Sequence, residues 1–175
     1  MKSLYVLTAL SVLAPQYLQA EDPKSAYAPG VIKGTFVIQG LHCPPCTRTV
    51  EAALAKTKGV QSAKVDWKTK NAWLTFDEGV ISAQQVAQTI AGTPHMMGGG
   101  MHYKGTLALK VEGLKDEGAN KTAKDALSQV PGVSKVYIYP QQQSAVVEFA
   151  DKGKTTSQQL IEALTKAGFP TALFK

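Results

Sequence analysis

The sequence is poor in cysteine, arginine and aromatic residues. Of its 175 residues, two are cysteines, one is an arginine and 7% are aromatic. Nucleic-acid-binding proteins cluster arginine and lysine with aromatic side chains, so a net charge of +6 on dispersed lysines does not favour that function. The composition, 44% hydrophobic and 18% charged, is that of a folded chain, and it argues against low-complexity disorder and a multi-pass membrane protein.

Long apolar runs are also missing beyond the first residues of the chain. Lys2 precedes a largely apolar run from Leu4 to Ala14, and Leu18-Gln19-Ala20 resembles a cleavage site with small residues. A run of this length is too short to span a bilayer, which needs roughly 20 residues. We therefore predict a signal peptide over residues 1–20, with an uncleaved anchor as the alternative, and a flexible tether over 21–32. The protein is expected to be exported to a periplasm or outside the cell, with no integral membrane segment after cleavage.

The two cysteines, Cys43 and Cys46, are separated by two residues. Exported proteins normally pair their cysteines for stability. A disulfide that closes so small a loop constrains little of the unfolded chain and therefore stabilises little. The spacing thus predicts a reactive pair rather than a structural bridge.

The chain contains an internal repeat at an offset of 73 residues, which indicates a tandem duplication. Gly40-Leu41 recurs as Gly113-Leu114, Gly59-Val60 as Gly132-Val133, and Phe76 as Phe149.

Each copy shows the order strand, helix, strand, strand, helix, strand. Strands are expected where apolar residues alternate, and helices where they recur every three or four residues. The first copy has strands at 35–39, 61–67 and 72–76, helices at 46–58 and 83–91, and a final strand that the pattern does not define. The second has strands at 107–111, 133–139, 145–149 and 171–174 and helices at 116–129 and 156–167. The predicted fold is α+β, two tandem ferredoxin-like βαββαβ units with two helices on one face of an antiparallel sheet.

The cysteine pair lies between the first strand and the first helix of the first copy. The helix dipole and unpaired backbone N–H groups acidify a thiol at a helix N-terminus. Pro44 and Pro45 lack N–H groups and restrict φ, which stiffens the loop. The spacing alone is compatible with a soft metal ion, half of a zinc site or a redox disulfide.

The segment Gly40-Leu41-His42-Cys43-Pro44-Pro45-Cys46 resembles the signature of the heavy-metal-associated (HMA) domain family, Gly-Met-x-Cys-x-x-Cys, which includes copper chaperones, metal-ATPase modules and periplasmic mercury-binding proteins. Leu41 replaces a methionine that in the family packs in the core. The resemblance implies that Cys43 and Cys46 hold Cu(I) or another thiophilic ion. It assigns a metal-binding domain to 33–102 and a second domain to 103–175, where Asp116 and Ala119 replace the cysteines.

A second cluster of soft and borderline ligands follows the second helix. The segment 94–102 holds every methionine after Met1 and two of the three histidines, and the third histidine adjoins Cys43. Thioether and imidazole groups suit copper, and methionine sites tolerate oxidising compartments better than thiolates do. In the family this loop lies beside the cysteine loop. The candidate auxiliary ligands are His42, His95, Met96, Met97, Met101 and His102, and the alternative is a glycine-rich linker.

These observations predict an exported, non-enzymatic metal-binding protein that binds Cu(I) through Cys43 and Cys46. It would transfer or sequester the ion, with a metal-transport or copper-dependent protein as partner. Hg(II) is the rival ion, and Zn(II) fits less well because a closed structural site needs four ligands. The rival function is a thiol-disulfide oxidoreductase that uses the same pair. A third alternative is a structural or interaction protein.

Overall fold

The structure is a computed structural model that describes residues 30–174, so the predicted signal peptide lies outside the described residues. The first unit begins at Val31, and the last two residues of the expected tether therefore belong to a strand. Its elements are β1 (Val31–Gln39), α1 (Pro44–Ala55), β2 (Val60–Asp66), β3 (Asn71–Asp77), α2 (Ala83–Gly92) and β4 (Lys104–Val111).

The second unit repeats this order and uses β4 as its first strand. Its further elements are α3 (Glu117–Ser128), β5 (Val133–Tyr139), a short 3₁₀ turn η1 (Pro140–Gln142), β6 (Ser144–Phe149), α4 (Ser157–Lys166) and β7 (Thr171–Leu173). Both second helices of the units, α2 and α4, start with a capping box, Ser82 with Gln85 and Thr156 with Gln159. The predicted α+β, ferredoxin-like tandem is thus confirmed.

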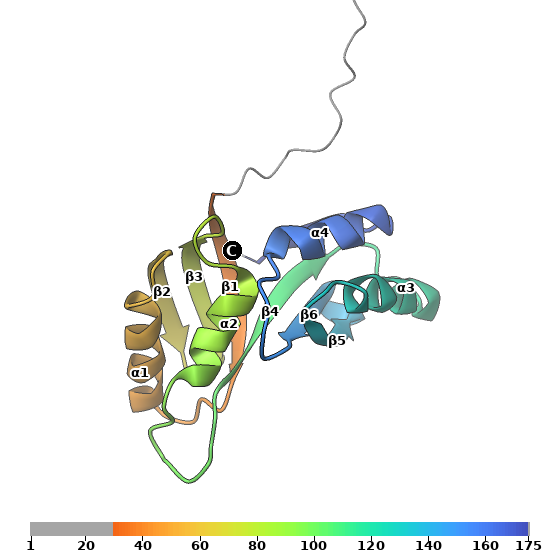
Figure 1. Cartoon of the computed structure of the whole chain (residues 1–175). Helices are drawn as coiled ribbons and strands as arrows, with labels where there is room; N and C mark the ends of the chain where they lie inside the picture. The colour runs from red at the N-terminus through yellow and green to blue at the C-terminus, as the bar shows by residue number, and fades with distance from the viewer. Residues whose placement is uncertain (1–29, 175) are drawn as a thin grey trace, which may run out of the picture.

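All seven strands form one sheet in the order β2-β3-β1-β4-β6-β5, with β7 also paired to β4 (Figure 1). Strand β4 pairs with β6 along one edge. Along its other edge, 104–108 pair with β1 and 109–111 with β7. One strand therefore closes the sheet of the first unit and opens that of the second. The predicted boundary at residue 103 falls immediately before this shared strand.

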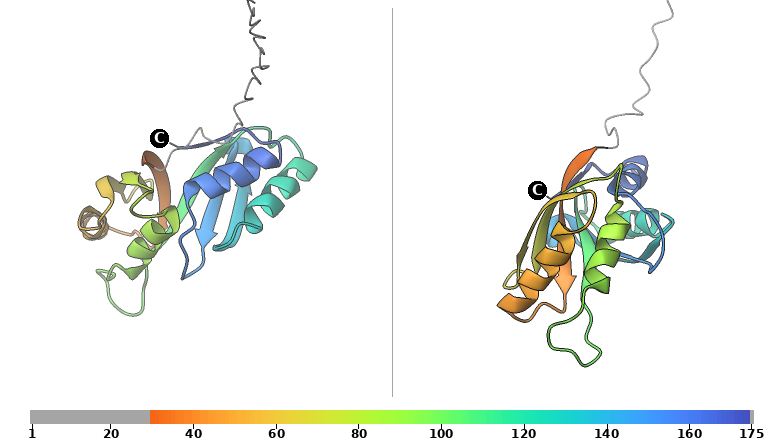
Figure 2. Two further views of the ribbon diagram at one scale, coloured as in Figure 1. Left: turned by 45° about the horizontal axis from the view of Figure 1, so that its top comes forward. Right: turned by 60° about the vertical axis from the view of Figure 1, so that its left-hand side comes forward.

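The four helices cover the same face of the sheet, and one core runs through both units (Figure 2). Alternate residues of β4 point toward the helices, and Leu107 and Leu109 are fully buried there. Gly105 lies under α2, where a Cβ atom would come within 2.8 Å of Ile90. The repeated positions agree in environment, since Leu54 and its counterpart Leu127 are both fully buried.

Polar contacts also join the helical layers of the two units. The buried side-chain amide of Gln84, in α2, donates to the carbonyl oxygens of Ala150 and Lys152, and its oxygen accepts from the backbone N–H and the hydroxyl of Thr155. The Glu78 carboxylate accepts from the backbone N–H and hydroxyl of Ser157, at the start of α4. These contacts fix the first unit against the turn that begins the last helix of the second.

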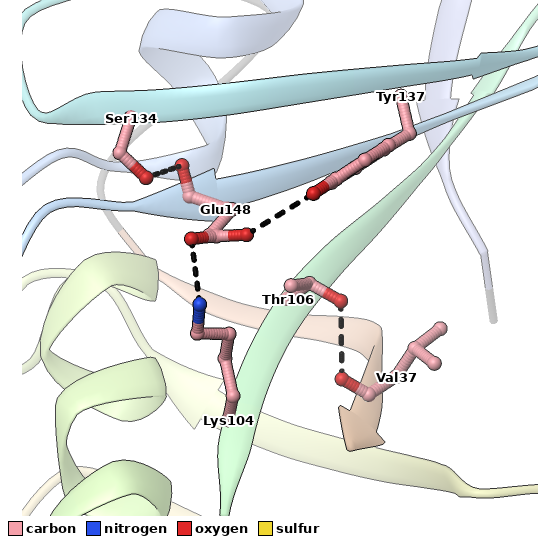
Figure 3. Close-up of polar contacts among 6 residues, drawn as sticks. All are labelled: Val37, Lys104, Thr106, Ser134, Tyr137 and Glu148. Carbon is pink, nitrogen blue, oxygen red and sulfur yellow. Dashed lines mark hydrogen bonds and ion pairs between the residues drawn. The ribbon is translucent and has the colours of Figure 1, made fainter.

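The helix-free face of the sheet carries a polar cluster across β1, β4, β6 and β5 (Figure 3). The Glu148 carboxylate is buried and receives a 2.8 Å ion pair from Lys104 and a 3.5 Å hydrogen bond from the Tyr137 hydroxyl. The Thr106 hydroxyl donates to the carbonyl oxygen of Val37. Strand β4 is therefore tied by side chains as well as by backbone to strands on both sides.

Two details differ from the sequence-based expectation. Helix α1 ends at Ala55 rather than at residue 58, and Lys56 is its C-cap. Gly59, expected to terminate this helix, instead has φ +95° in the turn before β2, where a Cβ atom would meet Ile81 at 2.7 Å. Among residues 30–174, no helix combines the length and apolarity required to cross a bilayer.

Candidate metal centre

The two cysteines lie at the start of α1, and the backbone there explains their exposure. Cys43 is the N-cap residue in an extended conformation, and it is half-buried. Pro44 and Pro45 form the first turn, where their missing N–H groups leave no intrahelical hydrogen bond unmade. Cys46 follows on the inner side of the helix and is fully buried. The loop thus presents one thiol outward and places the other at the edge of the core.

The pKa values of the two cysteine thiols are shifted in opposite directions. Burial acts to raise the pKa of Cys46, but the Cys43 thiol, the neighbouring Tyr103 hydroxyl and backbone N–H groups of His42 and Cys43 together hold it below its usual value. The pKa of Cys43 is raised because its thiol donates to Cys46. Cys46 is therefore the more acidic thiol of the pair and the first of the two to lose its proton. A soft cation that binds both sulfurs displaces the protons that they still carry.

Tyr103, the residue before β4, is the third group at this site and was not identified from the sequence. Its side chain is 1% exposed, and burial together with the Cys46 sulfur raises its pKa to about 12. The hydroxyl lies near Cys46 but makes no hydrogen bond of regular geometry within the described part of the chain. It remains protonated at neutral pH and is available to stabilise negative charge on the sulfur. An aromatic residue at the end of the His/Met segment was the only signal in the sequence.

His95 lies beside the cysteine loop, as the sequence suggested, but both of its ring nitrogens are engaged by backbone atoms. Nε2 is 2.9 Å from the Gly40 carbonyl oxygen, which can only accept, so Nε2 carries the proton. Nδ1 accepts from the backbone N–H of Met97 at 3.2 Å. The ring stacks on Tyr103, with centroids 4.5 Å apart, and lies 6.1 Å from the ring of His42. His95 thus acts as an anchor of the 93–103 segment in this arrangement.

The remaining candidate ligands lie at the surface. His42 and His102 are exposed, and the exposed fractions of Met96, Met97 and Met101 are 55%, 62% and 39%. Over residues 30–174, no group of three or more His, Cys, Asp or Glu side chains converges in a way that could hold a metal ion. The described residues therefore offer a two-thiol site and no four-ligand site of the zinc type.

In the second unit the corresponding position is a helix cap. Asp116 is the N-cap of α3, and its carboxylate accepts from the backbone N–H of Ala119 at 2.8 Å. The preceding turn is conserved in shape, since Gly40 and Gly113 have φ of +90° and +93°. The fold of the loop is therefore kept, and the thiols are replaced.

The chain is similar in sequence to proteins of known name. It is 38% identical over 94 residues to the mercuric transport protein periplasmic component of Shewanella putrefaciens, covering 53% of this chain and 87% of the relative. It is 38% identical over 60 residues to the copper chaperone CopZ of Staphylococcus haemolyticus, covering 34% of this chain and 88% of the relative.

Longer relatives match both units. The copper-transporting ATPase HMA5 of Oryza sativa subsp. japonica is 26% identical over 132 residues, which is 74% of this chain but spans 13% of the length of the ATPase. Among solved structures, the water-soluble region of the P-type ATPase CopA from Bacillus subtilis covers 84% of this chain and 93% of its own, with 19% identity and a TM-score of 0.39.

The family comparison covers both repeats. Residues 35–95 and residues 108–170 each match the family described as heavy-metal-associated domain. These ranges lie within the two ferredoxin-like units, and the first includes the cysteine pair. The chain therefore belongs to the heavy-metal-associated domain family, of which it carries two copies in tandem.

Proposed function

We propose that this protein is an exported carrier of Cu(I), which it binds through Cys43 and Cys46 and releases to a partner by ligand exchange. The observation that carries the proposal is the pair of adjacent free thiols, one half-exposed and one buried with a lowered pKa, at the tip of the first unit. Two thiolates suit a soft monovalent ion. No catalytic step is required of the protein.

Partial exposure of the site is what would permit transfer. An ion bound by Cys43 and Cys46 has two ligands and is partly exposed on the Cys43 side. It can accept a third sulfur ligand from an incoming protein before either of its first two bonds breaks, so the ion never has to enter solution. His42 is exposed next to Cys43 and is placed to influence this approach. The partner is expected to be a metal-transport or copper-dependent protein that presents its own thiolates or thioethers.

Hg(II) remains the second candidate ion, since a two-thiolate site also suits it. A mercuric transport protein periplasmic component is among the relatives, and a copper chaperone is another. The name of the first relative also supports the proposed export to a periplasm. Transfer of Cu(I) is favoured over Hg(II) here because the methionines of the 93–103 segment provide thioethers on the same end of the unit.

A thiol-disulfide oxidoreductase is supported less well by the site. Such enzymes attack with an acidic, accessible thiolate. Here the more accessible thiol, Cys43, has the raised pKa, and the buried Cys46 has the lowered one. This order is the reverse of what attack on a substrate disulfide requires.

The test is a titration of the reduced protein, residues 21–175, with Cu(I) against a chromophoric chelator. We expect the parent protein to bind one tightly held equivalent more than Cys43→Ser/Cys46→Ser does. The matched control is Asp116→Ser/Ala119→Ser, which changes the corresponding positions of the second unit and should retain that equivalent. An unchanged number of tightly held equivalents after removal of both cysteines would contradict the proposal. A parallel Hg(II) titration with competing glutathione ranks the two ions.

A further inference from the structure

The connection between α2 and β4 is much longer than its counterpart in the second unit. It comprises eleven residues, 93–103, whereas the connection between α4 and β7 comprises four, 167–170. Both connections join corresponding elements of a repeated fold. The extra length is made up largely of Met96, Met97, Met101 and the glycines 98–100. The insertion is therefore specific to the unit that carries the cysteines.

Both ends of this insertion rest on Gly40, at the base of the cysteine loop. At its start, His95 Nε2 donates to the Gly40 carbonyl oxygen. At its end, the His102 carbonyl oxygen lies so close that a Cβ atom on Gly40 would meet it at 2.7 Å. Figure 1 shows the loop between α2 and β4 at the same end of the unit as the start of α1. The insertion thus leaves and returns next to the thiols.

Between these two anchors the methionines are not used for packing. All three are exposed, although burying a methionine side chain would stabilise the fold by about 1.5–3 kcal/mol. Gly98, Gly99 and Gly100 all have positive φ, and Cβ atoms placed on them would meet nothing within 4 Å. The tip of the loop is therefore unobstructed, and its glycines allow it to fold around a ligand.

We propose that Met96, Met97 and Met101 form a second site that binds a soft monovalent cation, Cu(I), through three thioether sulfurs. Thioethers are soft ligands and select Cu(I) over harder ions. Both ring nitrogens of the nearby His95 are engaged, so the site is assigned to the thioethers alone. The two sites share no ligand, so this inference goes beyond the proposed role of the cysteines and can fail independently of it.

The chemistry of the ligands distinguishes the two sites. A thioether has no proton to lose, so its affinity for Cu(I) does not fall with decreasing pH, whereas a thiolate pair must be deprotonated to bind. Thioethers also do not form disulfides. The methionine site should therefore hold its ion in acid and after oxidation of Cys43 and Cys46, conditions in which the thiol site is lost.

The experiment uses the protein from residue 21 to 175 with Cys43→Ser/Cys46→Ser as the background. Cu(I) titrations at about pH 5 and about pH 7 compare this background with a variant that also carries Met96→Leu, Met97→Leu and Met101→Leu. We expect one equivalent in the background, with affinity that changes by less than about threefold between the two pH values. The leucine variant should bind at least about tenfold more weakly, which corresponds to about 1.4 kcal/mol.

A second measurement identifies the ligands directly. Because every methionine after Met1 lies in the insertion, the methionine methyl NMR signals report on this site alone. We expect Ag(I), as a spectroscopic substitute for Cu(I), to shift all three signals in the cysteine-free background. Unshifted signals, or equal affinity of the background and leucine variants, would overturn the inference. If the parent protein bound no equivalent beyond the one bound by the cysteine-free background, only the proposed role of the thiols would be contradicted.

Discussion

Cys43 and Asp116 occupy the same position in the two units, the N-cap of the first helix, but only Asp116 caps its helix. The Asp116 carboxylate accepts the Ala119 N–H, whereas the side chain of Cys43 makes no capping hydrogen bond. The first unit therefore leaves its helix terminus uncapped and keeps the sulfur available. The second unit uses the same position for stability.

This difference predicts unequal effects of substitution at the two N-caps. Asp116→Ala should lower the free energy of unfolding by about 1 kcal/mol, because a backbone N–H loses its acceptor. Cys43→Ala should lower it by less, and Cys43→Ser should raise it by about 0.5 kcal/mol, since serine is a good N-cap. Urea unfolding of the reduced, metal-free proteins measures all three. Equal losses in the two alanine variants would contradict the assignment.

Tyr103→Phe tests the role of the buried hydroxyl beside Cys46. Removing the hydroxyl should raise the lower apparent pKa of the cysteine pair, because the Cys46 thiolate loses a neighbouring donor. The free energy of unfolding should change by less than about 1 kcal/mol, since the hydroxyl makes no regular hydrogen bond. The thiolate absorbance as a function of pH gives the first quantity. The control is Tyr137→Phe, a hydroxyl bonded to Glu148 on the helix-free face, which should leave the thiol titration unchanged.

Gln84→Ala tests the contact between the helical layers. Truncation leaves two carbonyl oxygens and the Thr155 N–H without this partner in a buried position, whereas the Thr155 hydroxyl keeps the Pro131 carbonyl oxygen, so we expect a loss of about 2–4 kcal/mol in the free energy of unfolding. Gln61→Ala, at an exposed position of β2, is the control and should change it by less than about 0.5 kcal/mol. Similar values for the two variants would show that the contact does not stabilise the tandem.

Glu78 makes the stability of the protein depend on pH in a defined direction. Burial raises the pKa of its carboxyl, against the opposing effect of the Ser157 N–H and hydroxyl. A raised carboxyl pKa contributes stability below the unfolded-state value, and this contribution is lost as the pH rises through the folded-state value. Glu78→Gln does not titrate, so its free energy of unfolding relative to the parent should increase between about pH 4 and about pH 7. Denaturant unfolding across this range measures the difference. A constant or decreasing difference would be inconsistent with this sign.

Gly40→Ala tests the turn on which the cysteine loop and the insertion meet. A Cβ atom there would clash with the His102 carbonyl oxygen and would force alanine to adopt φ +90°. We expect a loss of about 1–3 kcal/mol in the free energy of unfolding and faster amide exchange in the 93–103 segment. Gly92→Ala is the control, because Gly92 is helical and has open space around it, and it should stabilise the protein by up to about 1 kcal/mol. If the two variants behaved alike, the close approach of Gly40 and His102 would be excluded.

Sequence reasoning identified most helices and strands because the signals for them are local. Phe36 and Ile38 are buried in β1, and Ala72, Leu74 and Phe76 in β3, as their alternation predicts. The end of α1 was placed three residues too late, since Gly59 fits a helix terminus as well as it fits the turn that it forms. The last strand of the first unit was undefined because the residues that form it, 104–111, already matched the start of the second unit.

By itself, the sequence determined the duplication, the α+β order of each unit, the family signature and the position of Cys43 and Cys46 at a helix start. These depend on spacing and on residues near one another in the chain. Only the tertiary structure showed that one strand serves both units, that Tyr103 faces Cys46, and that His95 is bound to Gly40, 55 residues away. It likewise joined Gln84 to Thr155 across 71 residues. Each edge of a strand and each ring nitrogen of a histidine can take one of several partners. Packing between segments distant in the sequence decides which partner each one takes, and no local sequence pattern encodes that choice.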